Sequence, residues 1–225
     1  MNLEQTVITA EKKVVLPYAP TKEYEVESLG KLQPKPFYDF VKRCGDIVLS
    51  AFLLLLLAIP MCIIAVLVKV TSPGPALYSQ ERLGKDGKKI MICKFRTMIC
   101  NSEVDVIRWS YDEDPRVTPL GRFLRKYHID ELPQLWDILR GVLSFVGPRP
   151  EREVFYDAFE EYIHGFHERL KVKPGLTGLA QITGGGMMPP EEKIVCDLEY
   201  IRNRSIWLDL KLMVKTVVVV LAGRF

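Results

Sequence analysis

The sequence predicts a mainly α-helical protein with one small β-hairpin, held at a membrane by a helix in its N-terminal third. The first observation behind this prediction is an uncharged apolar run from Ile47 to Val68. The second is a series of segments in which apolar residues recur at helical spacing, and the third is a glycine-containing turn between two short apolar stretches. The 225 residues allow one domain of ordinary size with a tail.

Composition and patterning divide the chain into three parts. Residues 1–36 are predicted to be a mobile N-terminal tail, because Pro, Lys and Glu are scattered through them without a sustained period. Residues 37–71 are expected to form an interfacial lead-in and a membrane helix, and residues 72–225 the remaining domain. Within that domain, residues 210–221 are apolar enough to pack in the core or to lie on the membrane.

Overall charge and cysteine usage limit the kinds of partner and compartment. The formal net charge of +3 argues neither for nor against nucleic acid, and we expect no nucleic-acid partner. The five cysteines are an odd number and lack the spacing of a metal site. They therefore indicate a reducing compartment and not a disulfide framework.

The apolar run is long enough to cross a bilayer, since as a straight helix it would reach about 33 Å. Pro60 lies near its middle, where proline removes a backbone donor and clashes with the preceding turn, so a kink is expected. Basic residues stand at both ends, with Lys42 and Arg43 before the run and Lys69 after it. A kinked helix that enters and leaves by the same face keeps both ends on one side; a straight spanning helix with a proline kink is the alternative.

The hairpin and several helices are expected after the membrane segment. Proline and glycine at 72–75 end the first helix. Residues 76–82 and 88–95 are predicted to be two strands around a turn at 84–87. Further on, residues 151–171 and 191–203 are predicted to be helices.

Two helices are expected around an adjacent pair of acidic residues. Thr118 followed by Pro119 is a good helix start, and the residues after them place an apolar face opposite one that carries Arg122, Arg125 and Lys126. Pro133 is tolerated only in the first turn of the second helix. Asp130 and Glu131 are therefore predicted to lie at or just before the N-terminus of that helix.

This placement indicates phosphate chemistry. A helix N-terminus favours the charged form of a carboxylate, and Mg²⁺ prefers one or two carboxylates together with phosphate oxygens. Guanidinium groups suit phosphate, and Arg122, Arg125 and Arg149 lie near the acidic pair in the sequence. The pair is therefore interpreted as a metal-assisted site for a diphosphate; a capped helix with a solvated charged face is the alternative.

The motifs together resemble those of bacterial sugar transferases, the small monotopic phosphoglycosyl transferases that start glycan assembly on polyprenyl phosphate. The resemblance extends from about Phe37 to the C-terminus and leaves the first 36 residues unmatched. The matching segments are Lys42-Arg43 with Asp46, Pro60, Thr71-Ser72-Pro73-Gly74-Pro75, Arg82-Leu83-Gly84, Lys94-Phe95-Arg96-Thr97-Met98, Gly121-Arg122-Phe123-Leu124-Arg125, Asp130-Glu131-Leu132-Pro133-Gln134-Leu135, Gly147-Pro148-Arg149-Pro150-Glu151 and Lys173-Pro174-Gly175-Leu176-Thr177-Gly178.

A few positions depart from the family pattern. Ile59 precedes the helix proline and His128 precedes the acidic pair, at two places where serine is frequent. Val142 replaces an acidic residue, and the glycines after Gly184 replace an arginine. None of these departures affects the acidic pair.

The resemblance implies a fold and a mechanism. The implied fold is a monotopic membrane protein with a Pro-kinked re-entrant N-terminal helix and a cytoplasmic α+β catalytic domain. Asp130 is implied to attack the β-phosphorus of a UDP-sugar, releasing UMP and leaving a phosphosugar on its carboxylate, which polyprenyl phosphate then takes. Glu131 is implied to hold Mg²⁺. The expected phosphate-binding residues are Arg125, Arg149, Arg122, Lys94 and Arg96, and the expected sugar pocket contains Thr177, Gly184, Gly185 and Gly186.

The resemblance also implies partners and a location. The expected partners are a UDP-sugar, polyprenyl phosphate and membrane lipids, and a homo-oligomer is compatible with the sequence. The expected location is the bacterial inner (plasma) membrane, with the catalytic domain and both termini cytoplasmic, at the first membrane step of a glycan pathway. Two other functions are the alternatives. One is a membrane-bound Mg²⁺-dependent hydrolase of nucleotide-diphosphate sugars, which would also use Asp130 and Glu131. The other is a non-catalytic membrane-tethered scaffold whose basic surface binds anionic lipids or partner proteins.

Overall fold

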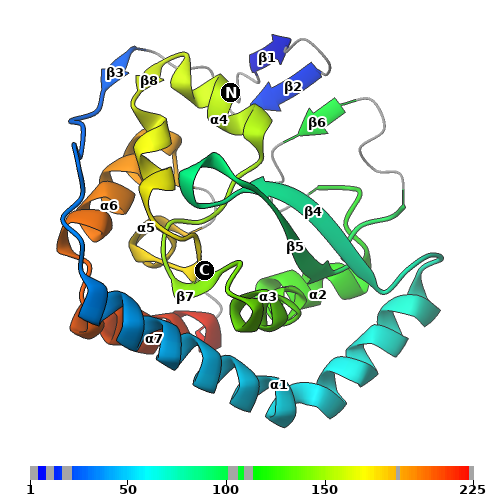
Figure 1. Ribbon diagram of the computed structural model, residues 1–225. Helices are drawn as coiled ribbons and strands as arrows, with labels where there is room; N and C mark the ends of the chain where they lie inside the picture. Colours follow the sequence, from blue (N-terminus) through cyan, green and yellow to red (C-terminus); the bar gives the residue numbers. More distant parts are fainter. Residues whose placement is uncertain are drawn as a thin grey trace.

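The computed structural model describes residues 5–8, 13–16, 22–100, 106–108, 114–185 and 188–222. It is mostly helical, as predicted, with one long apolar helix near the N-terminus (Figure 1). The α-helices are α1 (Pro36–Thr71), α2 (Pro119–Lys126), α3 (Gln134–Arg140), α4 (Glu153–Glu160), α5 (Leu179–Gly184), α6 (Pro190–Asn203) and α7 (Ile206–Leu221). The described residues also form the short 3₁₀ helices η1 (Lys85–Gly87), η2 (Ile129–Glu131) and η3 (Phe166–Lys171).

The strands form small separate pairs and one three-stranded sheet. The predicted hairpin is present: β4 (Leu77–Leu83) pairs antiparallel with β5 (Lys89–Phe95). The remaining strands, which were not predicted, are β1 (Gln5–Ile8), β2 (Lys13–Leu16), β3 (Tyr24–Glu25), β6 (Val106–Arg108), β7 (Ser144–Val146), β8 (Ile163–His164) and β9 (Gly175–Thr177). β1 and β2 pair antiparallel, β2 and β6 parallel, and β3–β8 and β7–β9 are parallel pairs.

Helix α1 lies along the lower edge of the molecule in Figure 1, beside α7 and below α2 and α3, and its ribbon changes direction before it reaches β4. It is long and apolar enough to cross a membrane, and most of it is not covered by the rest of the described chain. Leu55 and Ile59, for example, are 82% and 74% exposed. Such a continuous exposed apolar surface is typical of a membrane-contacting segment.

Polar side chains fasten the N-terminal half of α1 to the body. Arg43 donates two hydrogen bonds of 2.8 Å to the carbonyl oxygens of Ile138 and Leu139 at the end of α3. Asp46, which is buried, accepts hydrogen bonds of 3.1 Å from the Ser144 hydroxyl and the Phe145 amide in β7. Because α3 immediately follows the acidic pair, these contacts fix that pair relative to helix α1.

A second fastening joins α1 to α6 and α7. The buried carboxylate of Asp209 on α7 accepts hydrogen bonds from Tyr38 (2.9 Å) and Lys42 (2.7 Å) of α1 and from Tyr200 (2.9 Å) of α6. Burial and the nearby Asp209 charge raise the pKa of the Tyr38 hydroxyl, so Tyr38 stays protonated and donates. The first turns of α1 and α7 therefore lie side by side, as Figure 1 shows.

The structure differs from the expected mobile tail in residues 22–35, which are held against the body. The β3 strand pairs with β8, and the Leu29 amide donates to Glu168 at 2.6 Å. Arg204 donates to the Gln33 carbonyl at 2.8 Å, and Lys35 to the Arg204 carbonyl at 2.9 Å. These partners lie more than a hundred residues away, which is why local patterning did not predict them.

The expected helix over residues 151–171 was wrong, because the chain turns inside it. α4 ends at Glu160, β8 follows, and Gly165 adopts a left-handed conformation (φ 97°) before η3. Phe155, Phe159 and Phe166 still share the main core, together with apolar side chains of α6. The spacing of these aromatic residues therefore reflects packing in one core and does not indicate one continuous helix.

Gly121 allows α2 to approach the hairpin closely. Thr118 caps α2, its hydroxyl accepting from the Gly121 amide at 2.9 Å, and the Thr118 amide donates to the Thr97 carbonyl at 2.9 Å. A Cβ on Gly121 would collide with that same carbonyl oxygen. The close approach brings α2 and its arginines next to the end of β5.

We therefore expect Gly121→Ala to lower the free energy of unfolding by about 1–3 kcal/mol through overpacking. Gly45→Ala in α1 is the matched control, because its Cβ would meet nothing within 4 Å, and there alanine should stabilise the helix by up to about 1 kcal/mol. Chemical unfolding in detergent measures both values. Equal effects of the two substitutions would contradict the close approach.

Candidate active site

The acidic pair lies in η2, immediately before α3, as the sequence predicted. The chain enters η2 through His128, whose backbone is left-handed (φ 52°), and α3 begins at Gln134 after Pro133. Asp130 and Glu131 are each only 6% exposed. Two adjacent carboxylates buried this deeply require either cationic partners or a function that uses them.

Glu131 has cationic partners from two other elements. Its Oε1 accepts from Lys94 Nζ of β5 at 2.5 Å and from Arg149 Nη2, which follows β7, at 2.5 Å. Arg149 Nη1 lies 3.3 Å from Oε2. Burial alone would raise the pKa of Glu131, but Arg149 and Lys94 outweigh it and hold that pKa well below its usual range. Glu131 is therefore ionised at neutral pH.

Asp130 is in the opposite situation. Within the described ranges, no ion pair or hydrogen bond engages its carboxylate. Burial raises the pKa of Asp130 to about 6; Lys94 opposes this rise and the neighbouring Glu131 adds to it. From the sequence, a helix N-terminus was expected to favour the charged form of this carboxylate, and the structure corrects that expectation. Helix α3 begins only at Gln134, and burial has the largest effect on the pKa of Asp130. Asp130 is thus a buried carboxylate without an ion-pair partner among the described residues, close to the three cations Lys94, Arg125 and Arg149.

The expected phosphate-binding cations differ in how close they lie to the acidic pair. Lys94 and Arg149 contact Glu131 directly. Arg125 donates through Nε to the Thr97 hydroxyl at 2.9 Å, and its charge is among those that lower the pKa of Asp130. Arg122 is exposed and is not among the charges that act on either carboxylate. The structure therefore brings Lys94, Arg125 and Arg149 to the pair, and leaves Arg122 on the outer side of α2.

Arg96 has a structural position at the end of α1. Its guanidinium donates to the carbonyl oxygens of Ser72 and Pro73, both at 2.7 Å, and approaches that of Val68 at 3.3 Å. A cation there satisfies the free carbonyls at a helix C-terminus. To bind a phosphate Arg96 would have to leave these carbonyls, so its predicted phosphate role remains a prediction.

The expected sugar-pocket residues lie apart from the pair in the sequence and in their contacts. Thr177 of β9 is buried and shares a 2.7 Å hydrogen bond with Thr216 of α7. Gly184 ends α5, Gly185 follows it with φ 68°, and Gly186 lies outside the described residues. No hydrogen bond or ion pair in the described part of the chain joins Thr177, Gly184 or Gly185 to Asp130 or Glu131.

A layer of buried charges behind Arg149 was not predicted. Arg169 donates to the Arg149 carbonyl oxygen at 2.9 Å and pairs with Asp197 at 2.6 Å, and both of these side chains are fully buried. Glu151 accepts from Arg82 and Lys193, each at 3.1 Å. A sequence signal existed: Lys193 and Asp197 are four residues apart on α6, and each directly precedes a core residue, Ile194 or Leu198.

This layer predicts an acid sensitivity that depends on Glu151. Burial would raise the pKa of Glu151, but Lys193 and Arg82 outweigh burial and hold the pKa at about 2, against an ordinary value of 4.5. Because the pKa of Glu151 is lower in the folded than in the unfolded chain, its ionised carboxylate stabilises the fold fully above pH 4.5. This stabilisation is lost as the pH falls toward 2. This pKa shift corresponds to about 3 kcal/mol of unfolding free energy.

We expect Glu151→Gln to unfold about 3 kcal/mol more easily at pH 7, and the difference from the unchanged protein to shrink to roughly half by pH 3. Unfolding free energies measured across this pH range test it. The exposed Glu161→Gln is the control, with no pH-dependent difference expected. A Glu151→Gln difference that stays constant with pH would contradict the ion-pair account.

The acidic pair fits a divalent cation only in combination with a substrate. No group of three or more His, Cys, Asp or Glu residues that could hold a metal occurs among the residues the structure describes. Mg²⁺ commonly uses one or two carboxylates plus phosphate oxygens, so Asp130 and Glu131 with a diphosphate make a reasonable oxygen set. For this, a Glu131 oxygen would have to exchange one of its contacts with Lys94 or Arg149.

Comparison with known proteins identifies the family. A family described as "Bacterial sugar transferase" matches residues 37–223. The chain belongs to the bacterial sugar transferase family. The resemblance inferred from the motifs is thereby confirmed, and the matched residues include α1, the acidic pair and α7.

Individual relatives of the sugar transferase carry informative names. The chain is 41% identical over 198 residues to the UDP-N-acetylgalactosamine-undecaprenyl-phosphate N-acetylgalactosaminephosphotransferase of Aeromonas hydrophila, covering 87% of this chain and 47% of that protein. It is 40% identical over 205 residues to the UDP-glucose:undecaprenyl-phosphate glucose-1-phosphate transferase of Escherichia coli, with coverage of 85% and 44%. A Caulobacter vibrioides protein of the latter name is 41% identical over 189 residues, with coverage of 82% and 71%. The chain thus spans about half the length of the first two relatives.

Proposed function

We propose that this protein transfers a sugar 1-phosphate from a UDP-sugar to polyprenyl (undecaprenyl) phosphate and releases UMP. The observation that supports it most is the buried Asp130 carboxylate, which has no ion-pair partner among the described residues and stands next to Glu131, Lys94 and Arg149. The names of the relatives support the same reaction class. They differ in the sugar, so the donor sugar stays open.

The proposed reaction has two steps. In the first, an Asp130 carboxylate oxygen forms a bond to the β-phosphorus, and the bond from that phosphorus to the oxygen bridging the two phosphates breaks. UMP leaves with that oxygen and its electron pair. In the second, an oxygen of the polyprenyl phosphate bonds to the same phosphorus, and the Asp130 carboxylate leaves. A covalent intermediate lets one site serve a soluble donor and then a lipid acceptor.

The surrounding charges suit this chemistry. Lys94, Arg125 and Arg149 offer positive charge where negative charge gathers on the transferring phosphoryl group. A raised pKa of about 6 leaves Asp130 mostly deprotonated at pH 7 and poorly solvated, which favours attack on phosphorus. Glu131 would hold Mg²⁺, which supplies further charge neutralisation at the diphosphate when bound.

Membrane placement brings the acceptor to the site. The exposed apolar surface of α1 would lie in the bilayer, and Arg43 ties α1 to the C-terminal end of α3, the short helix that begins just after the acidic pair. A lipid phosphate at the membrane surface could then reach Asp130. We further propose that α1 is re-entrant with its break at Pro60, that residues 72–225 form a cytoplasmic catalytic domain, and that the product enters a bacterial glycan pathway.

The activity is tested with the full chain in detergent, radiolabelled UDP-sugars, Mg²⁺ and polyprenyl phosphate. Transfer predicts label in the lipid fraction and one UMP for each labelled lipid. A water-soluble sugar phosphate formed without lipid would mean a hydrolase, and absence of turnover across all donors would mean a scaffold. A donor panel of UDP-hexoses with their N-acetyl and deoxy relatives identifies the sugar.

Topology provides a separate prediction. A re-entrant α1 keeps both ends of the chain on the cytoplasmic side, so single cysteines introduced at positions 30 and 225 should both react only with a reagent that reaches that side. The control background replaces the five natural cysteines. Opposite accessibility of the two positions would mean that α1 spans the membrane.

A further inference from the structure

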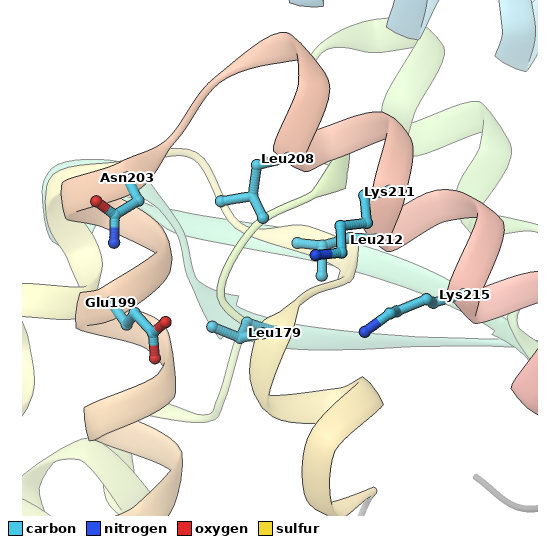
Figure 2. Close-up of a pocket in the computed structure, with 7 residues that line it drawn as sticks. All are labelled: Leu179, Glu199, Asn203, Leu208, Lys211, Leu212 and Lys215. Atoms are coloured by element: carbon cyan, nitrogen blue, oxygen red, sulfur yellow. The ribbon is translucent and has the colours of Figure 1, made fainter.

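A cavity of about 170 Å³ lies between α5, α6 and α7, and none of the residues that line it belongs to the acidic pair or its cations. Figure 2 shows Lys211 and Lys215 of α7 facing Glu199 and Asn203 of α6 across a leucine floor. Leu179, Leu208 and Leu212 form that floor. The cavity thus combines two ammonium groups with an apolar base.

Helix α7 has an exposed apolar side next to this cavity. Trp207 is 81% exposed and Val214 65%. At about 100° per residue these two residues fall on one side of the helix with three others. The remaining members of that exposed side are Leu210, Val217 and Val218.

The two lysines lie at the border of that apolar side. Counting around the helix, Lys211 and Lys215 fall between the exposed apolar residues and the inward-packing side of Leu208 and Leu212. Lysines at such a border extend their amines to the level of lipid headgroups when the apolar side contacts a membrane. The first turns of α7 also lie beside membrane helix α1.

The charges around the cavity have no partners among the described residues. No ion pair or side-chain hydrogen bond in that part of the chain engages Lys211, Lys215 or Glu199. Two ammonium groups against one carboxylate leave a net charge of +1 at the cavity. The volume is below the roughly 300–1,000 Å³ of typical small-molecule sites, too small to enclose a nucleoside diphosphate. A small basic cavity suits one phosphodiester whose acyl chains remain in the bilayer.

We propose that this cavity binds the headgroup of an anionic phospholipid, with Lys211 and Lys215 on the phosphate. Asn203 offers an amide to the headgroup, and the leucine floor contacts the glycerol. The site is separate from the sugar-phosphate transfer proposed above and adds a second lipid contact on the α7 side of α1. It would hold the body at a fixed height and tilt on the membrane.

The test uses native mass spectrometry of the full chain in detergent, titrated with phosphatidylglycerol or phosphatidylcholine. We expect a retained phosphatidylglycerol adduct, with affinity at least 5-fold above that for phosphatidylcholine. Since a lysine near an anionic lipid contributes about 1 kcal/mol, Lys211→Gln/Lys215→Gln should weaken phosphatidylglycerol binding by roughly 10-fold or more. The matched control, Lys85→Gln/Lys88→Gln, removes the same charge from exposed positions in the β4–β5 turn, outside the cavity, and should change phosphatidylglycerol binding less than 3-fold.

Two further measurements distinguish a specific binding site from general electrostatic attraction. Leu179→Phe fills the cavity without changing charge and should weaken phosphatidylglycerol binding with both lysines present. Inorganic phosphate at 10 mM should leave the lipid adduct in place. Equal losses in the two lysine variants, an unaffected Leu179→Phe variant, or displacement by inorganic phosphate would each overturn the proposal.

Discussion

Replacing Asp130 with asparagine is expected to lower UMP release by at least about 10⁴-fold, because the amide cannot attack phosphorus. Asparagine has nearly the same shape, and the raised pKa of about 6 means that the charged carboxylate is unfavourable where it is buried. The variant should therefore unfold at an equal or higher denaturant concentration than the unchanged protein. Loss of activity together with retained or increased stability is typical of a functional group held in an unfavourable environment.

The measurement combines an initial-rate UMP assay with chemical unfolding of the same detergent-solubilised sample. Asp157→Asn on α4 is the matched control, since Asp157 is exposed and outside the site; it should leave both quantities unchanged. An Asp130→Asn variant that keeps more than a tenth of the activity would exclude Asp130 as nucleophile. A variant that loses activity only because it unfolds would show that the carboxylate has a structural role.

Replacing Arg169 with methionine is expected to have the largest effect on stability. The guanidinium pairs with Asp197, and both side chains are at most 1% exposed. It also donates to the Arg149 carbonyl and packs on the rings of Tyr156 and Phe166. Removing one partner of a buried pair leaves an uncompensated charge, so we expect a loss of about 3–5 kcal/mol in unfolding free energy.

A double substitution separates charge compensation from packing. Arg169→Met/Asp197→Leu removes both charges and should recover much of the loss, since replacing a whole buried pair with apolar residues is often close to neutral. Arg202→Met is the control for an exposed pair, because Arg202 lies 2.7 Å from Glu27 with both side chains largely exposed. It should cost less than about 1 kcal/mol. A double variant as unstable as Arg169→Met would mean that packing, and not the unpaired charge, dominates.

Local signals predicted those parts of the fold that depend on neighbouring residues. Thr118 and Pro119 marked the start of α2, and the glycine turn marked the β4–β5 hairpin. Pro133 placed the acidic pair just before α3. In each case the required backbone conformation is specified by the residues that adopt it.

Contacts between residues far apart in the sequence could not be predicted from the pattern of apolar and charged residues. Residues 22–35 contain no period, yet β3 pairs with β8 and Leu29 bonds to Glu168, far along the chain. Arg96 was expected to bind phosphate, and its position in the sequence gives no indication of which groups it contacts in the fold. Its actual neighbours are carbonyl oxygens at the end of α1. The partners of a charged side chain follow from tertiary structure, and sequence spacing supplies only the candidates.

The residues of the candidate site were named from the sequence, but the electrostatic difference between the two carboxylates was not predicted. Motif resemblance assembled Asp130, Glu131, Arg125 and Arg149, while the structure divides the two carboxylates by environment. Glu131 is held charged by Arg149 and Lys94, and Asp130 is buried without an ion pair among the described residues. Two adjacent acidic residues whose pKa values differ in this way suit two different roles, and this difference supports Asp130 as the nucleophile.

The most direct test is mass spectrometry of the full chain after incubation with its UDP-sugar and Mg²⁺ but without polyprenyl phosphate. The account predicts a mass increase of one sugar phosphate, located by peptide sequencing on Asp130, and its disappearance when polyprenyl phosphate is added. Transfer that proceeds at full rate with no adduct, or an adduct on another residue, would contradict it.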